Sequence, residues 1–140
     1  MNHTPIKVVI VDDHRMVRET WKMILDNHEQ IDVIAECASG EEAIEAAAAL
    51  KPDVMLMDIN MEPVNGLEAT QEILKLNPNA RIIGVSVNDQ PMYAKNMMKY
   101  GAKGYMTKNC SMTEMVHAII EVNKGNTYLC EDIRDKMQPN

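Results

Sequence analysis

Five polar side chains follow or end short apolar segments of the chain. They are Asp12, Asp13, Asp58, Ser86 and Lys108. Carboxylates brought to one place repel each other, by about 1 kcal/mol at ~4 Å in water and about 4 kcal/mol at an effective dielectric of 20. A divalent cation removes that repulsion, and Mg²⁺ prefers one or two carboxylates, retained waters and a phosphate oxygen. The residue types therefore indicate a magnesium site that handles phosphate.

The same side chains could carry out phosphoryl transfer. A carboxylate can attack phosphorus and form an aspartyl phosphate. The other requirements are charge neutralisation and positioning, which Mg²⁺, the Lys108 ammonium and the Ser86 hydroxyl can meet. Taken singly, each residue has an ordinary explanation. Asp12 and Asp13 suit a helix N-terminus and Asp58 suits a turn cap. Ser86 could be only a small polar residue at a strand end, and Lys108 a surface lysine. Only their joint occurrence at strand ends favours a common site.

Short apolar or β-branched segments predict strands, and amphipathic windows between them predict helices. The predicted strands are Ile6–Val11, Ile31–Cys37, Asp53–Asp58, Arg81–Val87 and Ala102–Thr107. The predicted helices are His14–Asn27, one from Ser39 to Leu50, one from Asn65-Gly66 to Asn77-Pro78, one from Pro91 to Gly101, and one from Ser111 to Gly125. Glu42 and Glu114 each follow a serine at capping-box spacing.

This alternation predicts an α/β fold: a doubly wound, five-stranded parallel sheet of flavodoxin-like type, with strand order 2-1-3-4-5. Ligands in such sheets bind outside the carboxyl ends of the strands, at the switch point between strands one and three. The five polar residues end or follow strands one, three, four and five, which are neighbours in this order. We therefore expect them to meet at one edge.

Composition limits the other functions. The 140 residues suit one domain, and the net charge of −7 is concentrated in residues 1–70, which hold 5 basic and 14 acidic side chains. That acidity argues against direct nucleic-acid binding and fits a cation site, or only a solubilising surface. Three cysteines without a CxxC motif indicate neither zinc nor disulfides. With no apolar stretch near the ~20 residues of a membrane span and no signal-peptide pattern, we expect a cytoplasmic protein without a membrane partner.

Around these residues the chain resembles the response-regulator receiver (CheY-like) family over about residues 6–125. The resemblance is carried by Val8–His14, Asp58–Met61 with Gly66, Val85–Val87 and Gly104–Lys108. It implies that Asp58 is the phosphoacceptor and that Asp13, Asp58 and the Asn60 carbonyl bind Mg²⁺ directly, with Asp12 acting through water. It further implies that Lys108 contacts a phosphoryl oxygen, that Ser86 is the switch hydroxyl, and that Tyr105 is the switch aromatic. By its place alone, Tyr105 is typical of a half-buried strand aromatic.

Two positions depart from that family. Glu62 stands where a proline is usual and Pro63 follows, so we expect an altered loop with an added acid near the metal. Asn109 follows Lys108, where many receivers have a proline with a cis bond; a non-proline cis bond costs about 3 kcal/mol, so trans is expected.

His14, Gly104-Tyr105, Lys108-Asn109 and Gly125–Leu129 are most similar to the NarL/FixJ (LuxR-type) subfamily. That resemblance implies a C-terminal helix-turn-helix, for which the 15 residues after Gly125 are too few. We therefore predict a receiver at residues 1–125 and, at 126–140, the start of a linker in a longer regulator, with a helix at Glu131–Met137; the alternative is a stand-alone receiver. The implied partners are a histidine kinase, a second copy of the chain on phosphorylation, and DNA only through the further domain.

Two other functions fit the fold. A phosphohydrolase working through an aspartyl phosphate often has a second aspartate two residues after the nucleophile, but Asn60 cannot act as that general acid. A flavodoxin-like cofactor binder needs a phosphate-cradling loop after strand one, where Asp12 and Asp13 would repel a phosphate without a metal. The sequence thus favours a phosphoacceptor with, at most, slow self-catalysed phosphorylation and dephosphorylation.

Overall fold

The computed structural model describes residues 4–62, 64–87 and 90–137. Within them the strands are β1 (Ile6–Val11), β2 (Ile31–Cys37), β3 (Val54–Asp58), β4 (Ile82–Ser86), β5 (Gly104–Thr107) and β6 (Tyr128–Leu129). The helices are α1 (Arg15–Asp26), α2 (Gly40–Leu50), α3 (Gly66–Leu76), α4 (Pro91–Lys99), α5 (Met112–Asn123) and α6 (Glu131–Met137). The strands form one parallel sheet in the order β2-β1-β3-β4-β5-β6.

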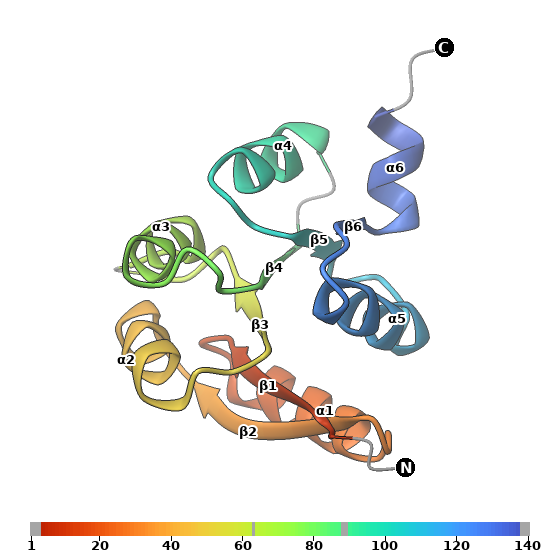
Figure 1. The fold of residues 1–140 in the computed structure, drawn as a ribbon. Helices are drawn as coiled ribbons and strands as arrows, with labels where there is room; N and C mark the ends of the chain where they lie inside the picture. The colour runs from red at the N-terminus through yellow and green to blue at the C-terminus, as the bar shows by residue number, and fades with distance from the viewer. Residues whose placement is uncertain (1–3, 63, 88–89, 138–140) are drawn as a thin grey trace.

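Helices cover both faces of this sheet. Figure 1 shows α2, α3 and α4 on one side, α1 and α5 on the other, and α6 beside β6 at the end of the sheet. The central strands β3, β4 and β5 are buried along their whole length, as expected for parallel strands covered on both faces. None of the helices in the described residues combines the length and the apolar character that a membrane span requires.

The helix ends follow local sequence signals. Asn65 and Glu68 form a complete capping box at the start of α3, where the sequence predicted a helix start. Pro91 occupies the first turn of α4, and Gly101 directly after that helix has φ 108°, a conformation that glycine adopts without a steric cost. These signals fix where each helix begins and ends relative to the sheet.

The predicted α/β class and the 2-1-3-4-5 order are confirmed. Three predicted strands were one or two residues too long, because Asp53, Arg81 and Ala102 lie outside β3, β4 and β5. The prediction of only five strands was wrong, since β6 adds a sixth beside β5. The boundary between a receiver at 1–125 and a linker at 126–140 stays a prediction, although β6 and α6 pack on the same sheet.

The two predicted serine capping boxes are only half formed. The Ser39 hydroxyl accepts from the Glu42 N–H (3.1 Å), but the Glu42 carboxylate accepts from Ala38 (3.2 Å), one residue before the cap. Ser111 likewise accepts from the Glu114 N–H at 3.1 Å. The Glu114 carboxylate turns away from that cap toward the C-terminal segment.

Glu114 fastens β6 and α6 to the rest of the domain. Its Oε2 accepts hydrogen bonds from the Tyr128 hydroxyl (2.8 Å) and the Glu131 N–H (2.9 Å), and it lies 3.8 Å from Arg134 Nη2. The Ile133 side chain of α6 is fully buried, which stabilises the docked helix by roughly 1.5–3 kcal/mol. The C-terminal segment is thus held by a polar contact at its start and an apolar one in its helix.

The Glu114 contacts predict a pH-dependent contribution to stability. Burial alone would raise the pKa of Glu114, but the hydrogen bonds from Glu131 and Tyr128 and the charge of Arg134 hold it below its ordinary value. A carboxylate whose folded pKa is lowered stabilises the fold above its unfolded pKa, and that stability is lost as pH falls through the folded pKa. Glu114→Gln should therefore lower the free energy of unfolding by about 1 kcal/mol at pH 7.

The measurement is urea unfolding followed by Trp21 fluorescence, across a pH range. The difference between wild type and Glu114→Gln should shrink as pH drops below about 4.5. Glu72→Gln, at an exposed helical ion pair with Lys75, is the matched control and should have little effect at any pH. A Glu114→Gln deficit that stays constant down to pH 3 would contradict this account.

Candidate functional site

The predicted site residues from β1, β3 and β5 meet at one edge of the sheet. Asp12 directly follows β1, Asp58 ends β3, and Lys108 directly follows β5. Lys108 Nζ lies 3.0 Å from Asp12 Oδ2 and 3.5 Å from Asp58 Oδ2. Because the parallel order places β1, β3, β4 and β5 side by side, residues far apart in the sequence share one site.

Two buried carboxylate oxygens at this site accept no hydrogen bond within the described part of the chain. Both aspartates that contact Lys108 have no exposed surface, and their Oδ2 atoms accept no hydrogen bond from the described residues. Lys108 approaches them as a counter-charge rather than as an aligned donor. Buried acceptors are normally satisfied, so these oxygens are available to coordinate a ligand.

The electrostatics of Asp58 support the same interpretation. Burial raises the pKa of Asp58, and the charge of Asp12 adds to that rise. The Asn60 N–H, which donates to Asp58 Oδ1 at 2.9 Å, and the Lys108 ammonium oppose it without reversing it. A cation bound beside the carboxylate would favour its charged form, the form that acts as a nucleophile.

Ser86 and Asn60 are connected across the site. The Ser86 hydroxyl at the end of β4 is buried and donates to Asn60 Oδ1 at 3.0 Å. Asn60 itself lies in the exposed turn after β3. The structure thus brings the predicted switch hydroxyl next to the predicted metal-ligand residue, and the hydrogen bond between their side chains was not predicted.

His14 is the site residue that sequence reasoning missed. Its Nδ1 lies 2.9 Å from Asp12 Oδ1 and 3.0 Å from Asp13 Oδ1, and this hydrogen bond and the two charges raise the pKa of His14. Within the described residues, Asp12, Asp13, His14 and Asp58 each offer one ligand atom, and these atoms lie within 4.8 Å of one another. Its place directly after the aspartate pair was the available signal.

Other predicted residues lie further from this cluster. Tyr105 has no exposed surface, so the prediction of a half-buried aromatic was wrong. Its backbone carbonyl accepts a hydrogen bond from the Cys130 N–H at 3.1 Å. Glu62 is exposed and does not belong to the group of ligand atoms, and Pro63 lies outside the described residues. The expected extra acid at the metal position is therefore not seen.

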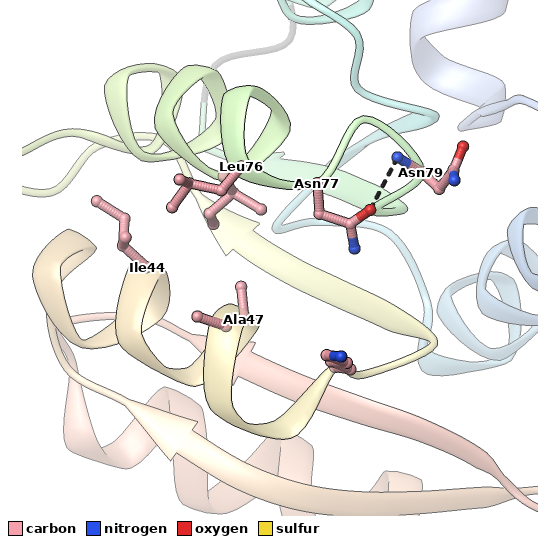
Figure 2. Close-up of a pocket in the computed structure, with 8 residues that line it drawn as sticks. Ile44, Ala47, Leu76, Asn77 and Asn79 are labelled. Atoms are coloured by element: carbon pink, nitrogen blue, oxygen red, sulfur yellow. Dashed lines mark hydrogen bonds between the residues drawn. The ribbon is translucent and has the colours of Figure 1, made fainter.

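A groove lies away from the acidic site. It has a volume of about 620 Å³ and runs between α2 and α3, where Ile44, Ala47 and Leu76 line its apolar part and Asn77 and Asn79 its end (Figure 2). None of its lining residues belongs to the acidic site. The acidic site is the better candidate for function, because ionisable groups and buried acceptors without hydrogen bonds converge there, whereas the groove offers mainly apolar surface.

Removing the Lys108 charge should destabilise the metal-free domain. Lys108→Met would leave Asp12 Oδ2 and Asp58 Oδ2 buried as like charges without a counter-ion, at a cost of roughly 1–2 kcal/mol in the free energy of unfolding at pH 7. Added Mg²⁺ should restore more stability to this variant than to wild type. The measurement is thermal or urea unfolding with and without Mg²⁺.

The control for that prediction is Lys124→Met. Lys124 forms an exposed ion pair with Glu121 at 3.4 Å, and such pairs contribute about 0–1 kcal/mol. Equal effects of the two substitutions, or a Mg²⁺ response no larger in Lys108→Met than in wild type, would contradict the assigned role of the ammonium.

The donor set fits Mg²⁺. It consists of hard oxygen ligands, and the Oδ2 atoms of the two buried carboxylates accept no hydrogen bond from the described residues. Asp13 and Asn60 are exposed, so waters and a phosphate oxygen could approach from their side. The lysine beside the two buried carboxylates could contact a phosphoryl oxygen. The arrangement can therefore place a phosphorus atom next to an ionised aspartate and balance its charge.

Comparison with known proteins gives one consistent family. Residues 8–120 match the family described as "Response regulator receiver domain". The chain is 38% identical over 132 residues to the response regulator GacA of Pseudomonas syringae, covering 94% of this chain and 62% of that protein. It is 36% identical over 129 residues to the transcriptional regulatory protein DegU of Brevibacillus brevis, covering 92% and 55%. The chain thus spans little more than half the length of these relatives.

Solved structures show the same fold. A LuxR-family two-component response regulator from Aurantimonas sp. SI85-9A1 superposes with a TM-score of 0.92 at 29% identity, covering 96% of each chain. The response regulator domain of Thermotoga maritima CheB superposes with a TM-score of 0.79 at 32% identity, covering 86% of this chain and 98% of that one. The first of these matches extends over nearly the whole chain.

Proposed function

This chain belongs to the response-regulator receiver family, and from that premise we propose that Asp58 is its phosphoacceptor. The observation that carries the proposal is the convergence of Asp12, Asp58 and Lys108, with one buried oxygen of each aspartate accepting no hydrogen bond. A receiver domain is a signalling component rather than a member of a known catalytic family. We propose that phosphoryl transfer to Asp58 is slow when self-catalysed and that it leaves the domain itself modified.

The transfer step uses groups that the site contains. An Asp58 carboxylate oxygen forms a bond to the phosphorus of the donor while the bond from phosphorus to the leaving group breaks, and the leaving group departs with that electron pair. For acetyl phosphate the leaving group is acetate; for a histidine kinase it is the phosphohistidine imidazole. Lys108 already pairs with Asp58. As the carboxylate loses its charge on phosphorylation, the Lys108 ammonium pairs with a phosphoryl oxygen in its place.

We assign the metal position to Asp12, Asp13, Asp58 and the backbone carbonyl of Asn60. Mg²⁺ bound there would neutralise charge on the phosphoryl oxygens and so lower the barrier to transfer. The unsatisfied oxygens of Asp12 and Asp58 support this assignment. The carbonyl of Asn60 is assigned from the family resemblance, and the N–H of the same residue holds Asp58 in place.

Ser86 and Tyr105 are proposed to transmit the change. To approach a phosphoryl group on Asp58, the Ser86 hydroxyl must leave Asn60 Oδ1, to which it donates at 3.0 Å. Tyr105 lies on the neighbouring strand, two residues before Thr107, the register partner of Ser86. A shift of Ser86 would therefore reach the buried aromatic through directly paired strands.

Output and partners are proposed for the longer protein. We infer that a histidine kinase supplies the phosphoryl group and that output is control of transcription, because the relatives are named as response and transcriptional regulators. DNA contact through a further domain and a homodimer on phosphorylation remain predictions. The described β6 and α6 segment would be the connection to such a domain.

Phosphodonor labelling tests the proposed function. The chain is incubated with acetyl phosphate in Mg²⁺ or in EDTA, and the intact mass is followed over time. We expect one phosphoryl group per chain in Mg²⁺, far less in EDTA, and slow loss after the donor is removed. Absence of labelling in Mg²⁺, or rapid multiple turnover on phosphate monoesters, would overturn the proposal.

A further inference from the structure

The imidazole of His14 lies against two aspartates of the acidic site. Its Nδ1 lies 2.9 Å from Asp12 Oδ1 and 3.0 Å from Asp13 Oδ1. Ionised carboxylates only accept hydrogen bonds, so the imidazole nitrogen between them must carry a hydrogen and act as donor. A nitrogen that donates a hydrogen bond has no lone pair for a metal ion.

The histidine therefore takes up carboxylate oxygens that the metal site needs. Asp13 offers its exposed carboxylate to the proposed Mg²⁺, and Asp12 lies beside it with its other oxygen, Oδ2, unsatisfied. A cation placed on these oxygens would meet the N–H of His14 pointing at it. The hydrogen bonds of His14 to the Oδ1 atoms and the coordination of Mg²⁺ therefore draw on the same two carboxylate groups, so each weakens the other.

Nothing else in the described structure holds the imidazole there. The side chain is 65% exposed, and although His14 is the N-cap residue of α1, its side chain makes no capping hydrogen bond. The backbone N–H of His14, by contrast, donates to Asp12 Oδ1 at 2.8 Å and is independent of the ring. The ring can therefore swing into solvent without disturbing the backbone at the site.

We propose that His14 sets the affinity of the metal site, as an internal hydrogen-bond donor that Mg²⁺ must displace and that weakens Mg²⁺ binding. This inference rests on the proposed function, because it takes the acidic cluster to be a divalent-cation site. It assigns to His14 the opposite of a ligand's role. The residue sets how much divalent cation is needed before the site is ready for phosphoryl transfer.

Two substitutions at this position separate a competing donor from a ligand. His14→Ala removes the donor, so Mg²⁺ and Mn²⁺ should bind more tightly, with Kd lower by about three- to tenfold, the range of one typical net hydrogen bond. His14→Asn keeps an N–H donor at the same distance along the side chain as Nδ1 and should return Kd to near the wild-type value. His28→Ala, which removes an imidazole outside the site, should leave Kd unchanged.

The experiment measures metal binding directly, without phosphodonor. Mn²⁺ is titrated into each protein and the free ion is followed by its electron paramagnetic resonance signal; Mg²⁺ affinity is obtained by competition. Circular dichroism of each variant confirms that the helices remain. Tighter binding in His14→Ala with recovery in His14→Asn supports the proposal.

The opposite results overturn it in distinguishable ways. Weaker Mn²⁺ binding in His14→Ala identifies the imidazole as a ligand, and equal Kd values in all variants show that the ring does not compete. Either result leaves the proposed function intact. Absence of divalent-cation binding in wild type overturns both this inference and the magnesium site of the proposed function.

Discussion

Replacing Asp58 by asparagine is expected to abolish phosphoryl labelling while leaving the domain folded. The amide is nearly the same shape as the carboxylate, and its oxygen can still accept the Asn60 N–H that Asp58 Oδ1 accepts at 2.9 Å. It removes one of two like charges buried around Lys108, so stability at pH 7 should be unchanged or higher. The amide nitrogen is not a nucleophile toward phosphorus, so the reaction has no starting atom.

The matched control is Asp32→Asn, the same chemical change at an exposed position of β2. Intact mass after incubation with acetyl phosphate and Mg²⁺ should show one phosphoryl group on wild type and on Asp32→Asn, and none on Asp58→Asn. Urea unfolding of all three verifies that the loss is not a folding defect. Labelling of Asp58→Asn at the wild-type level would move the phosphoacceptor to another residue.

The fold and the central residues of the site were predictable because both depend on strand ends. Short buried strands with amphipathic helices between them leave few arrangements, and the parallel order then determines which strand ends are neighbours. Asp12, Asp58 and Lys108 could be placed together on that basis, without any knowledge of their side-chain conformations. The contacts between them, at 3.0 and 3.5 Å, agree with that placement.

What the sequence did not reveal depends on side-chain direction or on contacts distant in the chain. The two-residue β6 is too short to produce an alternating pattern. It is a strand because Tyr128 and Leu129 pair with Gly104 and Tyr105 of β5. Glu114 stands at capping-box spacing, yet its carboxylate bonds to Tyr128 and Glu131, more than ten residues away. A spacing rule covers local partners only, so it could not anticipate these.

Local ambiguity also explains why the orientation of the His14 side chain was not predicted. A histidine after two aspartates can point to solvent, cap the helix or turn back onto the acids, and the sequence does not distinguish these orientations. The structure selects the third, with the ring nitrogen between Asp12 and Asp13. The consequences for metal binding follow only from that orientation.

A methyl group at Gly66 is expected to damage both the fold and the site. A Cβ at this position would lie 2.3 Å from the Asp58 carbonyl oxygen and 2.5 Å from the Ile59 Cα, both of which are backbone atoms. Backbone cannot move aside as a flexible side chain does, so either α3 or the turn after β3 must shift. We expect Gly66→Ala to lower the free energy of unfolding by roughly 2–4 kcal/mol, even though alanine is the better helix former.

The shift should also reach phosphoryl transfer, because the displaced carbonyl belongs to Asp58, the proposed phosphoacceptor. Gly125→Ala is the control: it makes the same chemical change where φ is 98° and no atom lies within 4 Å of the new Cβ. Its cost is the left-handed backbone alone, about 1 kcal/mol, with labelling unaffected. Urea unfolding and initial labelling rates distinguish the two variants. If Gly66→Ala were as stable as Gly125→Ala and labelled at the wild-type rate, the close approach of α3 to Asp58 would not be what holds the nucleophile in place.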